Sequence, residues 1–231
     1  MKNLKRKNIL SSIMSVLVIG IFVGSSFFAY QMFRDVMNRR KVLQDMIVRL
    51  EADSRISEVL VTNVEFNPIT QEHMTTIKFL EYDAMGRPMA PKYFTFSGNI
   101  IQFQSLVVRF ADVHVRMADA LRGKSVYLFW KVFMLNGEKT QEYPITNVNE
   151  IPAGYKVGET ASKFEKEIWQ EFWKVALDSK WAKGKGIKNA QIEAPGTKFI
   201  PGILYTLVIE HDGGIRIDSE EIPEVLKGEK L

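Results

Sequence analysis

The chain has 231 residues, which is enough for one terminal segment and one domain of ordinary size. Hydrophobic residues make up 46% and aromatic residues 11% of the sequence, a composition that supports a packed core and excludes a disordered chain. Cysteine is absent, which excludes disulfides, thiolate metal sites, iron–sulfur ligation and a thiol nucleophile.

The excess positive charge lies at the N-terminus. The chain has 31 basic and 27 acidic residues, and residues 1–33 contain four of the bases and no acid: Lys2, Lys5, Arg6 and Lys7. The other residues therefore carry 27 bases and 27 acids, so they have no overall attraction to polyanions, and we expect no nucleic-acid partner. The four bases favour a cytoplasmic N-terminus by the positive-inside rule.

No charged side chain occurs from Asn8 to Phe33. At 1.5 Å per residue this run reaches on the order of 37 Å, against a hydrocarbon core of about 30 Å, so we predict a transmembrane helix over residues 9–33 after a basic tail, residues 1–8. A cleavable signal peptide is the alternative, but the apolar run exceeds a typical signal core. The expected protein is a single-pass, signal-anchored protein of a bacterial inner membrane with a periplasmic C-terminal domain.

Two features of the N-terminal region suggest self-association. Gly20 and Gly24 form a GxxxG spacing, which permits close contact between two spanning helices. A juxtamembrane helical stalk is predicted over residues 34–55, with apolar residues at helical spacing: Val36, Leu43, Met46 and Leu50. The stalk could pair with another copy or pack on its own domain. Membrane lipids, other membrane or envelope proteins and a second copy are thus the expected partners.

From Ile56 onward the apolar residues alternate with a period of two, which predicts β-strands. Asn136-Gly137 and residues 211–214 are typical hairpin turns, and Asn67-Pro68 also indicates a turn. Residues 103–121 also fit a helix, but their valine content favours a strand ending at Phe110. The expected strands cover residues 56–66, 75–82, 93–96, 100–110, 126–135, 138–146, 203–210 and 215–218.

One strong amphipathic helix is expected over residues 159–181, with Thr160 as its N-cap. Its apolar face is aromatic and most resembles a core-facing surface: Phe164, Ile168, Trp169, Phe172, Trp173, Ala176 and Leu177. Antiparallel hairpins with one packed helix predict a soluble α+β domain over residues 56–220, followed by a flexible tail, residues 221–231.

The sequence contains no recognisable catalytic motif, and we predict no catalytic residue, cofactor or metal. The three histidines, His73, His114 and His211, are not placed by the sequence beside a serine nucleophile or in a familiar metal spacing. Glu210 and Asp212 flank His211 and could join it in binding a metal, but Asp and Gly in this segment are explained by a turn.

A local basic patch follows the amphipathic helix: Lys180, Trp181, Lys183, Lys185 and Lys188. Such a patch could contact an anionic surface or an acidic partner. The simpler interpretation is a helix C-terminus at which lysines complement the helix dipole.

Three functions remain open at this point. The leading hypothesis is a non-catalytic accessory, scaffold or assembly subunit of a membrane or envelope protein complex. The alternative is an anchored ligand- or lipid-binding, sensor-like module, which requires a pocket enclosed by the sheet and the helix. The third is an anchored hydrolase whose catalytic residues are dispersed in the sequence.

Overall fold

The computed structural model describes residues 18–38, 41, 55–69, 71–83, 85–110, 125–136, 139–156, 160–178, 187–210 and 214–223. The chain divides into two compact units, Met1–Leu43 and Gln44–Leu231, and each is considered by itself.

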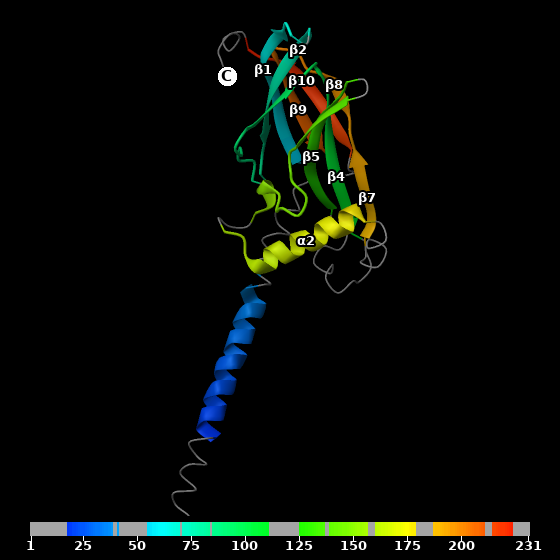
Figure 1. Cartoon of the computed structure of the whole chain (residues 1–231). Coiled ribbons are helices and arrows are strands. Elements are labelled where there is room, and N and C mark those ends of the chain that lie inside the picture. The colour runs from blue at the N-terminus through cyan, green and yellow to red at the C-terminus, as the bar shows by residue number, and fades with distance from the viewer. Residues whose placement is uncertain are drawn as a thin grey trace, which may run out of the picture. The chain divides into compact units, whose positions relative to one another are not determined.

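The first unit contains a helix over residues 18–38, coloured blue in Figure 1. Among the helices that the structure describes, none combines the length and the apolar character needed to cross a bilayer. Within this helix the apolar run is diluted by small and polar residues such as Gln31, and Arg34 and Asp35 follow before it ends. The finding contradicts the predicted transmembrane helix, and with it the signal anchor and the single-pass inner-membrane location. Residues 9–17 of the predicted span lie outside the described residues.

The second unit consists mainly of strands (Figure 1). The described elements are β1 (Arg55–Asn67), β2 (Glu72–Glu81), β3 (Lys92–Phe96), β4 (Ile100–Phe110), β5 (Ser125–Asn136), β6 (Lys139–Pro144), a 3-10 turn η1 (Ala153–Tyr155), α2 (Lys163–Leu177), β7 (Ile187–Glu193), β8 (Gly196–Lys198), β9 (Ile203–Ile209) and β10 (Ile215–Glu221).

The described strands form two antiparallel sheets of five strands each. The first sheet has the order β10-β9-β1-β2-β3, and we call it sheet I. The second has the order β6-β5-β4-β7, with β8 pairing to β4 beside β7, and we call it sheet II. The chain passes from sheet I to sheet II between β3 and β4, and returns between β8 and β9.

The predicted α+β class is wrong, because the domain is built from two antiparallel sheets and contains one helix of ordinary length in its described part. The predicted strands and both hairpins are present, with Asn136 opposite Lys139 and Ile209 opposite Ile215. The sequence reading missed β7 and β8, which pair with the far edge of β4 and complete sheet II.

The helix α2 is shorter than predicted and begins later. Its N-cap is Ser162, whose side chain accepts a hydrogen bond from the backbone N–H of Glu165 at 3.1 Å, whereas the prediction placed the cap at Thr160. The predicted aromatic face is buried: Trp169 and Trp173 are almost fully covered, and the Trp173 ring lies 6.4 Å from that of Trp130 in β5. The interpretation of this face as core is confirmed for Trp169, Phe172, Trp173 and Ala176, whereas Leu177 at the end of the helix is 42% exposed.

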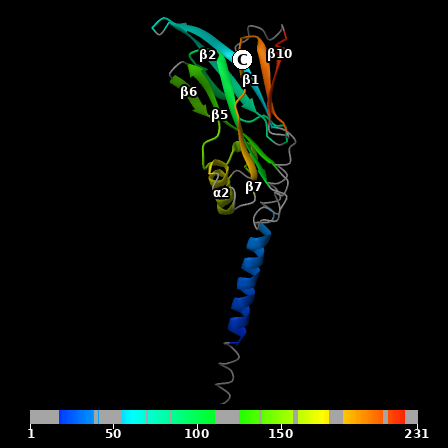
Figure 2. The same ribbon diagram turned by 90° about the vertical axis from the view of Figure 1, so that its right-hand side faces the viewer.

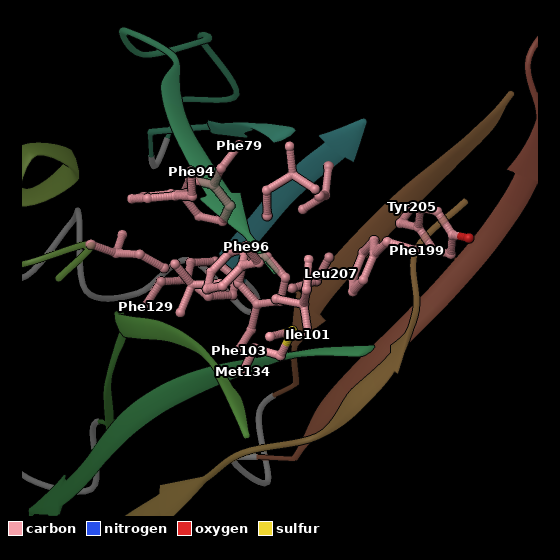
Figure 3. Close-up of a cluster of buried hydrophobic side chains, with 14 of the residues drawn as sticks. Phe79, Phe94, Phe96, Ile101, Phe103, Phe129, Met134, Phe199, Tyr205 and Leu207 are labelled. Carbon is pink, nitrogen blue, oxygen red and sulfur yellow. The ribbon is translucent and has the colours of Figure 1, made fainter. Parts of the chain in front are cut away.

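Aromatic side chains from both sheets form one core between them (Figure 3). The ring of Phe79 in β2 stacks on Phe103 of β4 at 5.6 Å and meets Phe129 of β5 edge-on at 5.5 Å. Phe199, after β8, lies edge-on to Phe103 and 4.4 Å from Tyr205 of β9. Aromatic rings in these geometries attract one another, in addition to the stabilisation that comes from their burial. The contacts therefore hold the two sheets face to face.

Side-chain hydrogen bonds close one side of the sandwich, where β3 and β6 are edge strands. The Tyr143 hydroxyl donates to the backbone oxygen of Thr95 at 2.8 Å, and Gln141 Oε1 accepts from the backbone N–H of Ser97 at 2.8 Å. The ammonium group of Lys92 donates to the backbone oxygen of Ile145. These bonds tie the edge of sheet I to sheet II.

Replacement of Phe79 by alanine should lower the free energy of unfolding by about 3–5 kcal/mol, because it removes a fully buried ring and leaves a cavity between the sheets. Tyr93→Ala is the control: Tyr93 lies on the neighbouring strand but is 56% exposed, so it should change stability by no more than about 0.5 kcal/mol. Chemical denaturation of the full chain measures both. A cost below about 1 kcal/mol for Phe79→Ala would contradict the shared core.

Candidate functional site

The core between the sheets does not account for all the apolar side chains of the hairpin formed by β1 and β2. Residues directly opposite each other in an antiparallel pair place their side chains on the same face of the sheet. The core-facing pairs run in sequence along the hairpin toward its turn: Val59 with Phe79, Val61 with Ile77, Val64 with Thr75, and Phe66 with His73. The face that forms the core near Val59 therefore continues to the hairpin tip.

A β-bulge at Thr62 keeps this face apolar. The register shifts between Val61 and Asn63, so that Thr62 is the extra residue, and its hydroxyl donates to the backbone oxygen of Thr76 at 3.3 Å. Without the extra residue, Asn63 and Glu65 would point toward the core side and Val64 would point away from it. The bulge thus continues the apolar face of the sheet past the point where the strand would otherwise present polar residues.

The apolar face is covered near Val59 and uncovered near the tip. Val59 is fully buried, whereas Val64 is 43% exposed and Phe66 is 50% exposed; Ile69, in the turn, is 90% exposed. Figure 2 shows the hairpin extending at the upper left beyond the neighbouring strands. Sheet II does not accompany it, since β4 begins at Ile100.

An open groove of about 600 Å³ lies under this face. It is lined from the hairpin and from the two connections between the sheets: Val64, Glu72, His73, Thr75, Ser97, Gly98, Asn99, Phe199 and Pro201. The hairpin tip, its uncovered apolar face and this groove form the candidate site.

The imidazole ring of His73 lines this groove. It lies 5.2 Å from the ring of Phe66, so it packs against the apolar face. Ser97 is held by Gln141, whose Nε2 donates to Ser97 Oγ at 2.9 Å, in the contact that joins β3 to β6. The Ser97 hydroxyl therefore has a structural role in this groove. Within the described residues, no three His, Asp or Glu side chains are grouped so that they could hold a metal ion.

The structure tests few of the residues predicted from the sequence. Gly20 and Gly24 lie in the described helix, where a Cβ added at either position would meet no atom within 4 Å beyond the neighbouring residues and the helix's own backbone, and Val36 is 40% exposed. Contact between helices at these positions stays a prediction. The backbone of Lys188 lies in β7. Other predicted residues lie outside the described part of the chain: Lys2, Lys5, Arg6, Lys7, Leu43, Met46, Leu50, His114, Lys180, Trp181, Lys183, Lys185 and His211.

Sequence reasoning missed the hairpin site, although a signal for it exists. Val59 and Val61 occupy odd positions, whereas Val64 and Phe66 occupy even ones. Such a change of parity within one strand indicates a bulge that keeps apolar residues on one face. The pattern does not reveal that the second sheet stops short of these residues.

Comparison of the chain with protein families, with curated proteins and with solved structures finds no match. The function must therefore be argued from the geometry of this site.

Phe66→Ser should change the free energy of unfolding by at most about 1 kcal/mol, because the side chain is already half exposed. It should also reduce the fluorescence of an apolar dye such as ANS bound to the native chain, because it removes the largest side chain of the uncovered face. Tyr93→Ser, at a similarly exposed aromatic position outside the groove, should leave dye binding unchanged. A loss of stability as large as that of Phe79→Ala would instead place Phe66 in the core.

Proposed function

We infer that the chain is a non-catalytic protein-binding module that acts as an accessory, scaffold or assembly subunit of a larger protein complex. The observation that carries this proposal is the uncovered core-type face of the β1–β2 hairpin, on which Val64 lines an open groove and Phe66 is half exposed. Clustered exposed apolar side chains with a polar rim are typical of protein interaction sites, because burying them against a partner is favourable.

The rigidity of the hairpin supports the same proposal. β2 pairs with β1 along the hairpin and with β3 from Thr75 to Phe79, and both β1 and β2 supply residues to the core between the sheets. The turn is also ordered locally: Asn67 Oδ1 accepts from the backbone N–H of Ile69 at 2.9 Å, and the Gln71 side chain donates to the backbone oxygen of Pro68 at 2.9 Å. A partner docking here loses little entropy in ordering this surface.

The filled interior favours this function over a ligand-enclosing module. Phe79, Phe103 and Phe129 are completely or almost completely buried, and Phe79 contacts both of the other rings between the sheets. The groove at the hairpin is open to solvent and lies outside this core. Its shape suits a segment of another protein lying along it better than a small molecule enclosed on all sides.

Site-specific crosslinking tests the proposal. A photoreactive phenylalanine analogue is placed at Phe66 in the full chain, and at Tyr93 in a matched control, in the cells that produce the protein. The two positions are aromatic and similarly exposed, but Tyr93 lies opposite Lys78, on the outer face of sheet I. We expect a discrete heterologous crosslink from position 66 and none from position 93, and loss of co-purification of that partner with the Val64→Ser variant.

Crosslinks of equal yield and identity at both positions would contradict the proposal, because they would not depend on the groove. Recovery of the uncrosslinked chain alone, as a monomer, from position 66 would also contradict it.

A further inference from the structure

The strand β1 is longer than its neighbour on one side. β9 pairs with β1 only over Arg55–Leu60, whereas β2 pairs with β1 as far as Asn67. In the part of the chain that the structure describes, no strand pairs with β1 on the β9 side from Val61 to Phe66. Every second residue of this segment therefore directs its backbone N–H and C=O toward a position in sheet I that no described strand occupies.

Other edges of the sandwich carry features that hinder the addition of a further strand, and this edge of β1 lacks them. The edge of β3 is met by side chains of β6, including the Tyr143 hydroxyl. The outer strand β10 carries an ionic network, in which Arg216 contacts Glu210 at 2.5 Å and Asp218 at 2.9 Å. Charges of this kind discourage an added strand. Along β1, the segment from Val61 to Phe66 carries a single charge, on Glu65.

The two faces of the segment differ in chemistry. Val64 and Phe66 point to the groove side, whereas Asn63 and Glu65 point to the outer side, where Asn63 Nδ2 donates to Glu65 Oε1 at 2.7 Å. Glu220 of β10 is on the same outer side, since it lies opposite Leu204, which lies opposite Leu60. A strand placed beside β1 would therefore meet apolar side chains on one face and carboxylates on the other.

We propose that the partner docks by adding an extended segment, in which apolar and basic residues alternate, as a new strand on the β1 edge from Val61 to Phe66. The inference rests on the proposed function and specifies its binding mode and the chemistry of its partner. Backbone hydrogen bonds to β1 supply affinity, the apolar residues of the added strand cover Val64 and Phe66, and its basic residues face Glu65.

A second copy of the chain is a poorer occupant than a basic segment. Two β1 edges paired around a two-fold axis would place their Glu65 carboxylates on the same face of one continuous sheet. Like charges on neighbouring strands oppose pairing, whereas a lysine or arginine in the added strand is attracted. Charge complementarity therefore favours a different, basic strand.

Synthetic peptides test the binding mode with the full chain. The probe is a labelled peptide in which valine and lysine alternate, and its controls are the same peptide with glutamate in place of lysine and a version N-methylated at alternate residues on one edge. Fluorescence anisotropy should show about tenfold or tighter binding of the valine–lysine peptide than of the valine–glutamate peptide. N-methylation on the edge that faces β1 should abolish binding, because it removes the backbone donors, whereas N-methylation on the opposite edge should not.

Glu65→Lys should reverse the preference between the two charged peptides. Glu167→Lys is the matched control: it makes the same change of charge at an exposed position on α2 and loses only a 3.9 Å contact with Lys163. This control should leave the preference of the wild-type chain unchanged. Circular dichroism establishes that both variants fold, so a misfolded chain is not mistaken for a failed interaction.

Equal binding of both charged peptides, or equal binding after N-methylation of either edge, would overturn strand addition. Concentration-dependent dimerisation that Glu65→Lys alters and Glu167→Lys does not would also overturn it, since the edge would then receive a second copy. In either case a heterologous crosslink from position 66 would leave the proposed function standing. The absence of that crosslink would contradict the proposed function itself.

Discussion

The aromatic contact between the sheets is the interaction on which the rest of the domain depends. Phe79 stacks on Phe103 and meets Phe129 edge-on, so a strand of sheet I is held against two strands of sheet II. These contacts define one face of β1 and β2 as the core face. Because the register is continuous apart from one bulge, the same face reaches the hairpin tip, where the opposing sheet has ended. The candidate site is therefore an extension of the core that no other described element covers.

The placement of Thr62 links this packing to the proposed function. A strand without the extra residue would turn Asn63 and Glu65 toward the groove and Val64 away from it, which would leave a polar tip. With the bulge, Val64 and Phe66 place apolar surface in contact with water, which is unfavourable. They add little to the stability of the isolated domain. An exposed apolar surface on a well-anchored hairpin is understandable if a partner covers it. The edge of β1 offers that partner backbone groups, and Glu65 gives it a charge preference.

Local patterns in the sequence predicted more of the fold than of the site. Strands such as Val126–Leu135 and the hairpin at Asn136-Gly137 depend on alternation and turn chemistry, which neighbouring residues determine. The strand β7 has weaker alternation and exists because it pairs with β4, a contact between residues far apart in the sequence. In the N-terminal segment, absence of charge is not the same as sufficient apolar character: none of the helices that the structure describes is long and apolar enough to cross a membrane. The exposure of Phe66 depends on where sheet II ends, which no local pattern specifies.

Amide hydrogen exchange of the free full chain tests the central claim. The claim is that β1 extends beyond β9, so that the β9 side of β1 is exposed to solvent near the hairpin tip. Along the β9 side of β1, the amides within residues 55–60 that bond to β9 should exchange slowly, whereas those within residues 61–66 that point to the same side should exchange nearly as fast as exposed amides. Amides that point toward β2 should be slow in both parts, which provides an internal reference. Uniformly slow exchange along the β9 side of β1 from residue 55 to residue 66 would contradict the account.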